Sequence, residues 1–178
     1  DAAQALLATY KGRSLGTLGH LGCLSFHETK NLISGEGGAL LINDERYAQR
    51  AEIIREKGTN RGRFLRGEVD KYTWVDLGSS FLPSELVAAF LDAQLAHAHE
   101  VIARRRAVCA RYRAGLTGLA AAGAIHLPPE VPADRCDNGH IFYFLAVTSA
   151  ARGALAAHLK SLDMLSVSHY VPLHPSPG

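Results

Sequence analysis

The pattern of apolar and polar positions in the first part of the chain predicts two strands followed by a helix. The apolar run at residues 20–26 is typical of a buried strand, and residues 38–42 form a second run of strand length. Asp44 is a favourable N-cap, so we expect a helix from about residue 45 to residue 56. Lys30 lies in the polar, glycine-bearing connection between the two predicted strands.

The rest of the pattern predicts a long loop and then a mostly helical stretch. Residues 58–82 hold turn formers, basic residues and aromatics without helical or strand periodicity, which indicates a loop. Pro83 suits the first position of a helix, and one apolar face then continues in a helix or helix pair to about Ala122. Beyond a proline-rich break, the pattern predicts a strand, a helix and a strand at residues 141–147, 152–162 and 165–171. This βαβ-like order indicates a small α/β domain.

Composition and charge argue against several classes of protein. The chain is 47% hydrophobic and 20% charged, as in folded soluble proteins. It has neither an apolar run of the ~20 residues that cross a bilayer nor a secretion signal, so we expect a cytoplasmic protein without a membrane partner. A net charge of +2 does not favour nucleic acid as a partner, and the arginine run 104–106 is typical of a solvated helix face. The scattered cysteines, Cys23, Cys109 and Cys136, predict neither a disulfide framework nor a metal site.

The two ends of the sequence indicate a piece of a longer protein. The chain begins at Asp1 rather than at a methionine, and it stops at Gly178 within a turn-like, proline-containing segment. We therefore expect further residues before Asp1 and after Gly178.

The string Ser-Phe-His-Glu-Thr-Lys-Asn at residues 25–31 carries most of the chemical information. A lysine forms a Schiff base only when its amine is deprotonated part of the time, which partial desolvation promotes. Lys30 follows a predicted buried strand, so it could hold such an amine; a solvated surface lysine is the alternative. The Glu-Gly-Gly sequence at residues 36–38 predicts a tight turn that requires positive φ.

This string resembles the cofactor-lysine motif of the DegT/DnrJ/EryC1/StrS sugar aminotransferases. These are α/β, fold-type I enzymes (aspartate aminotransferase-like) that use pyridoxal 5'-phosphate (PLP). The resemblance continues at separated strings, namely Asp-Ala-Ala-Gln at 1–4, Tyr-Lys-Gly-Arg at 10–13, Ile-Arg-Glu-Lys-Gly-Thr-Asn-Arg at 54–61, Asp-Lys-Tyr-Thr-Trp at 70–74 and His-Tyr-Val-Pro-Leu-His at 169–174. It implies that residues 1–82 belong to the large PLP-binding domain, and residues 83–178 to a linking helix and an incomplete small C-terminal domain.

The resemblance implies roles for four residues around the cofactor. Lys30 would hold PLP covalently and move the proton during amino transfer. Asp1 would pair with the pyridine nitrogen and favour its protonated form. Gln4 would contact the ring face or its 3-hydroxyl side, and Ser25 would donate its hydroxyl to the phosphate. The alternative for Asp1 is an exposed cap or turn residue, and Gln4 and Ser25 would then be ordinary polar residues.

Other residues would approach the substrate or a second subunit. The family pattern implies sugar-nucleotide contacts for His27, Tyr170 and His174. It also implies a homodimer with shared active sites, in which the 58–82 loop crosses the interface with Lys57, Asn60 and Tyr72. Structural or surface roles are the alternatives for all six residues.

One position departs from the family pattern. Many members supply an asparagine to the neighbouring subunit's cofactor phosphate where Leu82 stands here. Ser79 or Ser80 could take its place.

The longer strings are most similar to the branch that makes dTDP-4-amino-4,6-dideoxygalactose for polysaccharides such as enterobacterial common antigen or lipopolysaccharide. The implied donor is glutamate, and the implied acceptor is dTDP-4-dehydro-6-deoxyglucose. Another branch, acting on a UDP sugar or a 3-keto sugar, is an alternative, as is a non-catalytic regulatory or carbohydrate-binding protein of the same fold. Relatives that remove a sugar hydroxyl carry histidine at the lysine position, so Lys30 argues for amino transfer.

Overall fold

The computed structural model describes residues 1–170 and 173–176. Contacts between residues divide the chain into two compact units. The first unit comprises Asp1–Ala110 and Glu130–Ile141, and the second comprises residues 111–129 and the described part of 142–178. The expected domain boundary between residues 82 and 83 concerns the complete protein and stays a prediction.

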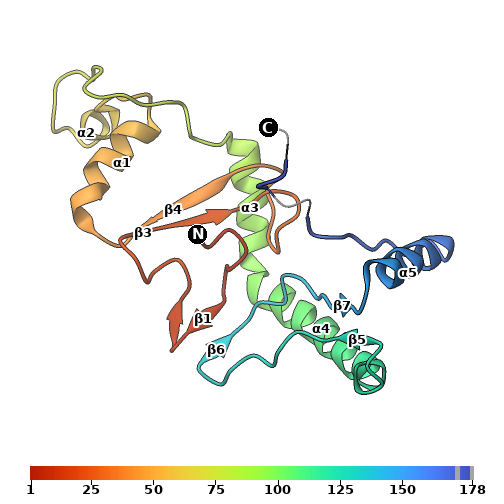
Figure 1. The fold of residues 1–178 in the computed structure, drawn as a ribbon. Helices are drawn as coiled ribbons and strands as arrows, with labels where there is room; N and C mark the ends of the chain where they lie inside the picture. Colours follow the sequence, from red (N-terminus) through yellow and green to blue (C-terminus); the bar gives the residue numbers. More distant parts are fainter. Residues whose placement is uncertain (171–172, 177–178) are drawn as a thin grey trace. The chain divides into compact units, whose positions relative to one another are not determined.

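The first unit contains an antiparallel hairpin of strands β3 (Leu21–Ser25) and β4 (Gly38–Ile42), shown in Figure 1. Both strands were expected at these positions. The expected burial of the first strand is wrong, because Gly22 is its only buried residue and Leu21 is 45% exposed. Side chains along a strand point alternately to opposite faces, and the described residues leave one face of this hairpin uncovered.

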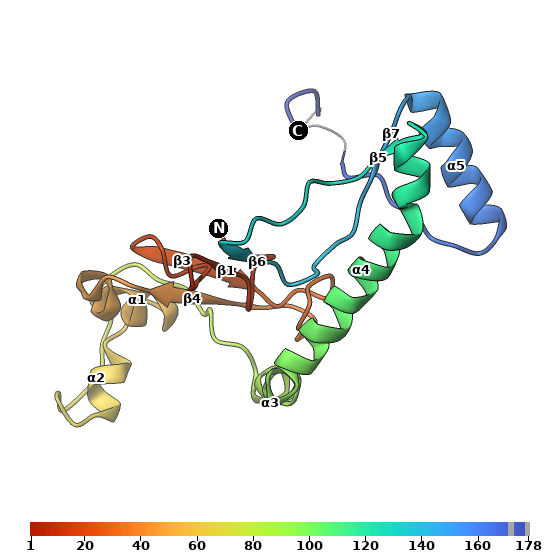
Figure 2. The same cartoon turned by 90° about the horizontal axis from the view of Figure 1, so that it is seen from below.

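A small three-stranded sheet joins distant parts of the first unit. Strand β1 (Thr9–Tyr10) pairs antiparallel with β2 (Arg13–Ser14) and with β6 (Arg135–Cys136), which lies beside it in Figure 2. The N–H of Ala2 donates to the carbonyl of Cys23 at 2.9 Å, so the N-terminal segment also runs along β3. These contacts place residues 1–14, β3 and residues 130–141 next to one another.

The helix expected after β4 is present. It starts with the 3-10 turn η1 (Glu45–Tyr47) and continues as α1 (Ala48–Arg55). Asp44 caps it as predicted, since its carboxylate accepts from the N–H of Arg46 at 3.1 Å.

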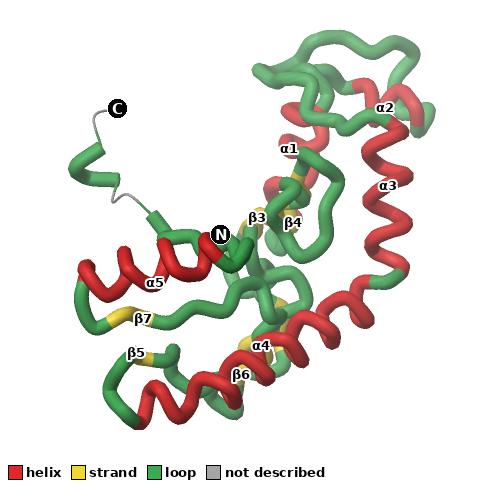
Figure 3. The backbone as a smooth tube through the Cα atoms, turned by 90° about the vertical axis from the view of Figure 1, so that its right-hand side faces the viewer, coloured by secondary structure: helices red, strands yellow, loops and turns green. Residues whose placement is uncertain are grey.

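The prediction of an irregular loop at residues 58–82 is wrong in part. The stretch contains helix α2 (Arg61–Leu65), which interrupts the loop between α1 and α3 in Figure 3. The N–H groups of Val75 and Asp76 donate to the carbonyl of Gly58 at 2.8 and 3.1 Å. A five-residue helix is too short to produce a recognisable apolar period.

The helical stretch predicted to about Ala122, as one helix or a pair, is confirmed as the pair α3 (Glu85–Ala96) and α4 (Ala98–Ala121). The predicted start at Pro83 is wrong. Ser84 is the N-cap, and its hydroxyl accepts from the N–H of Val87 at 3.3 Å. A side-chain acceptor satisfies an otherwise unpaired N–H of the first turn, which places the helix start after Ser84.

The second unit combines a short strand pair with one helix. Strand β5 (Ile125–His126) pairs antiparallel with β7 (Leu145–Ala146), and α5 (Ser149–Ser161) follows its N-cap Thr148. The helix was expected, but the predicted strand at 141–147 shortens to two residues and described residues 165–170 form no strand. The βαβ-like prediction is therefore wrong, because a strand forms only where a neighbouring strand pairs with its backbone. Val171 lies outside the described residues.

The buried apolar core is small. Among the described residues it consists of Ala2, Ala8, Phe26, Leu32, Ala98, Ile102 and Ile125. Leu32 is the largest fully buried side chain, at 1% exposure. No helix within residues 1–170 and 173–176 has the length and apolarity needed to cross a membrane.

Candidate functional site

The Lys30 loop, which we define as residues 26–37, connects β3 to β4 and closes on itself. The N–H of Phe26 donates to the carbonyl of Gly37 at 2.9 Å, and the N–H of Ser34 donates to the carbonyl of Phe26 at 2.8 Å. The buried Leu32 fixes the middle of the loop. The predicted positive-φ turn is confirmed at Gly37, whose φ is 127°. Backbone hydrogen bonds and a buried leucine thus stabilise the loop.

The side chain of Lys30 lies at a small pocket, called the Lys30 pocket below. It is lined by Ala3, Gln4, Leu6, Ser25, Lys30, Asn31, Leu32, Asn138 and His140. Gln4, Ser25 and Lys30, which the sequence placed around one cofactor, thus come together from three segments of the first unit. Their predicted roles in binding stay predictions.

Two polar groups of this pocket are arranged for distinct chemistry. Lys30 is half-buried, and within the described residues no hydrogen bond or ion pair to its amine is seen. The hydroxyl oxygen of Ser25 accepts from the N–H of His27 at 3.3 Å. That contact leaves the hydroxyl proton of Ser25 available for donation to an anion.

Asp1 lies beside the pocket in an exposed turn. Its carboxylate accepts from the N–H of Ala3 at 2.8 Å, and Ala3 is a pocket residue. The bond from Ala2 to Cys23 keeps this turn against β3. The expected contact of Asp1 with a pyridine nitrogen stays a prediction.

His27 is engaged within its own loop. Its Nδ1 accepts from the N–H of Thr29 at 3.2 Å and lies 2.9 Å from the hydroxyl of Thr29. Its Nε2 lies 3.7 Å from a carboxylate oxygen of Glu36. His27 is absent from the lining of the Lys30 pocket, and its predicted contact with substrate stays a prediction.

The other expected substrate residues, Tyr170 and His174, belong to the second unit. Tyr170 is 75% exposed, and His174 is exposed in a turn. Val171 and Pro172, which complete their sequence pattern, lie outside the described residues. Their contact with a sugar nucleotide stays a prediction.

The residues expected to reach a second subunit lie in or next to the folded 58–82 segment. The side-chain oxygen of Asn60 accepts from the N–H of Thr73 at 2.8 Å. The ring of Tyr72 packs 5.6 Å from that of Phe64, and Lys57 is exposed. Their role at an interface stays a prediction.

Three polar residues of the pocket had no assigned role in the sequence analysis: Asn31, Asn138 and His140. Asn31 is 8% exposed and Asn138 is 4% exposed. The Asp-Asn-Gly sequence at 137–139 is a strong turn signal, but it does not reveal which distant segment the turn contacts.

The expectation of a solvated arginine face on α4 is wrong for Arg105. Its guanidinium donates to the carbonyls of Gly139 and His140 at 3.1 and 2.7 Å. Arg104 follows the expectation and pairs with Glu100 at 2.6 Å on the exposed surface. A charge run does not show which of its members meets a buried turn.

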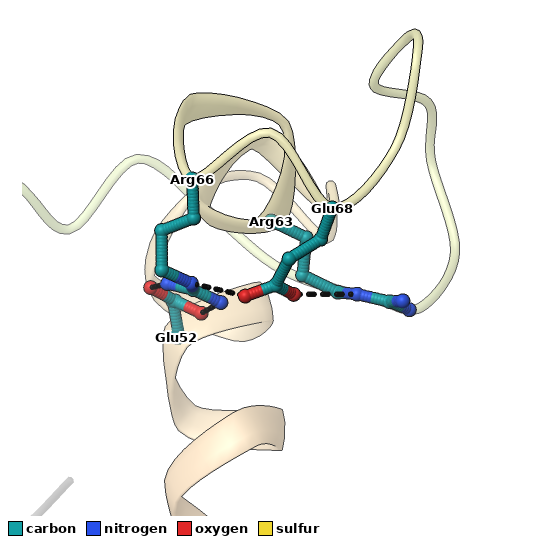
Figure 4. Close-up of polar contacts among 4 residues, drawn as sticks. All are labelled: Glu52, Arg63, Arg66 and Glu68. Carbon is teal, nitrogen blue, oxygen red and sulfur yellow. Dashed lines mark hydrogen bonds and ion pairs between the residues drawn. The ribbon is translucent and has the colours of Figure 1, made fainter.

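A separate ion cluster joins α1 to α2 (Figure 4). Both carboxylate oxygens of Glu52 accept from Arg66, at 2.8 and 3.2 Å. Glu68 accepts from Arg66 at 2.7 Å and from Arg63 at 3.1 Å. The hydrogen bonds from Arg66 lower the pKa of both carboxyl groups. Because these charges neutralise one another, the cluster is structural rather than a site for an ion.

No metal centre is visible in the described part of the chain, where no three His, Cys, Asp or Glu side chains gather closely enough to hold an ion.

Comparison with known proteins relates the whole chain to one family. The model of the DegT/DnrJ/EryC1/StrS aminotransferase family matches residues 1–178. The chain is 34% identical to the dTDP-3-amino-3,4,6-trideoxy-alpha-D-glucose transaminase of Streptomyces venezuelae, over 100% of this chain and 43% of that protein. It is 31% identical to the pleiotropic regulatory protein of Geobacillus stearothermophilus, over 99% of this chain and 44% of that protein. The chain thus spans less than half the length of these relatives.

The crystal structure of S. venezuelae DesV in complex with a ketimine intermediate is similar to this chain, with a TM-score of 0.83 and 34% identity. The similarity covers 99% of this chain and 44% of that one. It confirms the α/β, fold-type I class expected from the sequence.

Proposed function

Because the chain belongs to the DegT/DnrJ/EryC1/StrS aminotransferase family, we propose that it is the lysine-bearing part of a PLP-dependent enzyme that aminates a nucleotide-linked sugar. The observation that carries this proposal is the Lys30 pocket. It brings an amine, a hydroxyl and a side-chain amide together from segments that the sequence keeps apart.

The chemistry of these groups fits PLP. The amine of Lys30 is suited to bind an aldehyde carbon, and the hydroxyl of Ser25 is suited to donate to a phosphate. Gln4 supplies an amide at the same pocket, and Asp1 supplies a carboxylate next to it. When bound, PLP supplies an electron sink for the carbon that loses a proton.

The residues of this chain then divide the remaining work. Lys30 would hold the cofactor covalently, and its amine, once released, would take and return the proton. Asp1 would pair with the pyridine nitrogen and favour its protonated form, and Ser25 would donate its hydroxyl to the phosphate. Gln4 would contact the ring face or its 3-hydroxyl side.

For the substrates we propose glutamate as donor and dTDP-4-dehydro-6-deoxyglucose as acceptor, with dTDP-4-amino-4,6-dideoxygalactose as product. The name of the S. venezuelae relative supports a dTDP-linked sugar as the substrate class, although that enzyme's product carries its amino group at C3. The proposal that the amino group is transferred to C4 rests on the sequence strings alone. His27, Tyr170 and His174 would contact the sugar nucleotide.

We also propose a homodimer in which the 58–82 segment, with Lys57, Asn60 and Tyr72, approaches the partner's cofactor. Exposed apolar side chains in this segment support the proposal that a partner subunit covers it. Trp74 is 75% exposed and Leu77 is 86% exposed.

A second candidate function is regulatory. The G. stearothermophilus relative is named a pleiotropic regulatory protein and matches nearly the whole chain. The presence of Lys30, Gln4 and Ser25 at one pocket favours the enzyme, since a regulator that does not bind PLP has no need of this combination.

The deciding experiment uses the complete protein incubated with PLP and reduced with borohydride. Mass spectrometry should find PLP fixed to the peptide that contains Lys30, and none on that peptide in Lys30→Ala. The exposed Lys11→Ala serves as the matched control and should keep the adduct. Wild-type protein without an adduct would reject the proposed enzyme.

Turnover with glutamate and dTDP-4-dehydro-6-deoxyglucose should fall by roughly 10²–10⁴-fold in Lys30→Ala, the usual contribution of a group that moves protons. NMR of the product then assigns the stereochemistry at C4. Turnover of a UDP sugar alone would move the assignment to another branch.

A further inference from the structure

Asn138 joins two segments that lie more than a hundred residues away in sequence. Its amide nitrogen donates to the carbonyls of Gln4 and Leu6 at 2.8 and 2.9 Å. Its own backbone carbonyl accepts from the side-chain amide of Asn31 at 2.9 Å. At 4% exposure, Asn138 therefore holds the segment of Gln4 and the neighbour of Lys30 at once.

The turn that carries Asn138 is itself fixed to α4. The carboxylate of Asp137 accepts from the N–H of Gly139 at 2.7 Å, and the side-chain oxygen of Asn138 accepts from the N–H of His140 at 3.1 Å. Gly139 has a φ of +59°, and a Cβ there would lie 2.8 Å from the backbone nitrogen of Arg106. Together with the two hydrogen bonds from Arg105, these contacts fix the position of the turn against α4.

The same turn also holds the other end of the Asn31 amide. The side-chain oxygen of Asn31 lies 2.9 Å from Nδ1 of His140. An amide oxygen only accepts, so this contact requires the proton of His140 on Nδ1. Both polar atoms of Asn31 are thus bound to the turn, one residue after Lys30.

From these contacts we infer that Asn138 is a positioning residue for Lys30: its side-chain amide anchors the segment of Gln4, and its backbone carbonyl holds Asn31, the neighbour of Lys30. This inference rests on the proposed function. Asn138 thereby sets how the segment of Gln4 lies relative to Lys30 at the pocket that both line. A displacement on the order of 1 Å in an active site can cost about 100-fold in rate.

Three variants of the complete protein test this role. Asn138→Asp keeps the size and the acceptor for His140 but removes the donation to Gln4 and Leu6. Asn31→Ala leaves those two bonds intact and releases only the Lys30 loop. Asn43→Ala is the matched control, because the amide of Asn43 also donates to two carbonyls, those of Gly16 and Gly19, away from the pocket.

We expect kcat to fall at least about tenfold in Asn138→Asp and Asn31→Ala with little change in KM, as a misplaced reacting group requires. The borohydride-trapped adduct on Lys30 should form more slowly in both. In the cofactor-free proteins, hydrogen exchange should be faster at residues 27–32 in Asn31→Ala and at residues 2–8 in Asn138→Asp, and the rate of Lys30 acetylation should change in both. Asn43→Ala should leave all four measurements at wild-type values.

The inference would be overturned if folded Asn138→Asp and Asn31→Ala kept the wild-type kcat and the wild-type rate of Lys30 acetylation. An equal loss of kcat in Asn43→Ala would also overturn it. If Asn138→Asp fails to fold, Asn31→Ala decides by the same measurements. Wild-type protein without an adduct on Lys30 rejects the proposed function instead. Hydrogen exchange and acetylation then still decide whether Asn138 positions Lys30.

Discussion

Replacing Leu32 by alanine should loosen the Lys30 loop. Leu32 is 1% exposed and lies two residues after Lys30. Substitution of a fully buried leucine by alanine costs about 2–5 kcal/mol, from lost transfer free energy and from the cavity left behind. Leu32 also borders the Lys30 pocket, so it has fewer neighbours on that side. We therefore expect a cost in the lower part of this range, about 2–3 kcal/mol.

Native-state hydrogen exchange of the complete protein measures this cost at the loop. The N–H groups of Glu28, Lys30 and Ser34 are bonded within the loop, so they should exchange slowly in the wild type. A loss of 2–3 kcal/mol corresponds to exchange about 30- to 140-fold faster at these amides. The trapped PLP adduct on Lys30 should decrease in parallel.

Leu32→Met is the matched control, since a swap that conserves volume usually costs less than about 1.5 kcal/mol. The reasoning would be refuted if these amides exchanged less than about fivefold faster in Leu32→Ala than in the wild type. It would also be refuted if exchange in Leu32→Met were accelerated as much as in Leu32→Ala.

Three further predictions concern other parts of the first unit. Gly139→Ala should lower the free energy of unfolding by more than about 1 kcal/mol in a urea titration, because the residue has positive φ and meets the backbone of α4; an unchanged midpoint would contradict this. The hydrogen bonds from Arg66 lower the pKa of Glu52 in the folded protein. The ionised Glu52 therefore stabilises the folded protein above pH 4.5, the ordinary pKa, and this stabilisation is lost as the pH falls through the lower pKa of the folded state. Glu52→Gln should accordingly lower Tm at pH 7, and its difference from the wild type should narrow towards pH 4. Burial, with a smaller contribution from the charge of Asp137, raises the pKa of Cys109, so Asp137→Asn should speed its alkylation by iodoacetamide near neutral pH, as followed by mass spectrometry.

Sequence patterns predicted the helices and strands that are determined by residues close together in the chain. Strand β4 and the capped helix after Asp44 appear where the apolar runs and the N-cap signal placed them. Helix α2 was missed because five residues carry no period. Strand β6 was missed because its pairing depends on β1, more than a hundred residues away, and strand β1 was missed because two residues carry no period.

The same distinction holds for the candidate site. Family strings identified Lys30, Gln4 and Ser25, and the structure brings these residues to one pocket. Asn138 and His140 could not be found in this way, because a turn signal states the local shape of the chain and not its neighbours. Their importance follows from the hydrogen bonds to Gln4 and Asn31, which only the folded chain shows.

The connection of Asn138 to Gln4 and Asn31 has a consequence for the order of events during synthesis. A ribosome releases Lys30 and its loop long before it releases residues 137–140, which complete the wall of the pocket. Contacts between residues so distant in sequence form late, since a long loop must close first. A nascent chain that ends before residue 130 therefore carries Lys30 without Asn138 and His140, and the pocket is complete only after most of these residues have emerged.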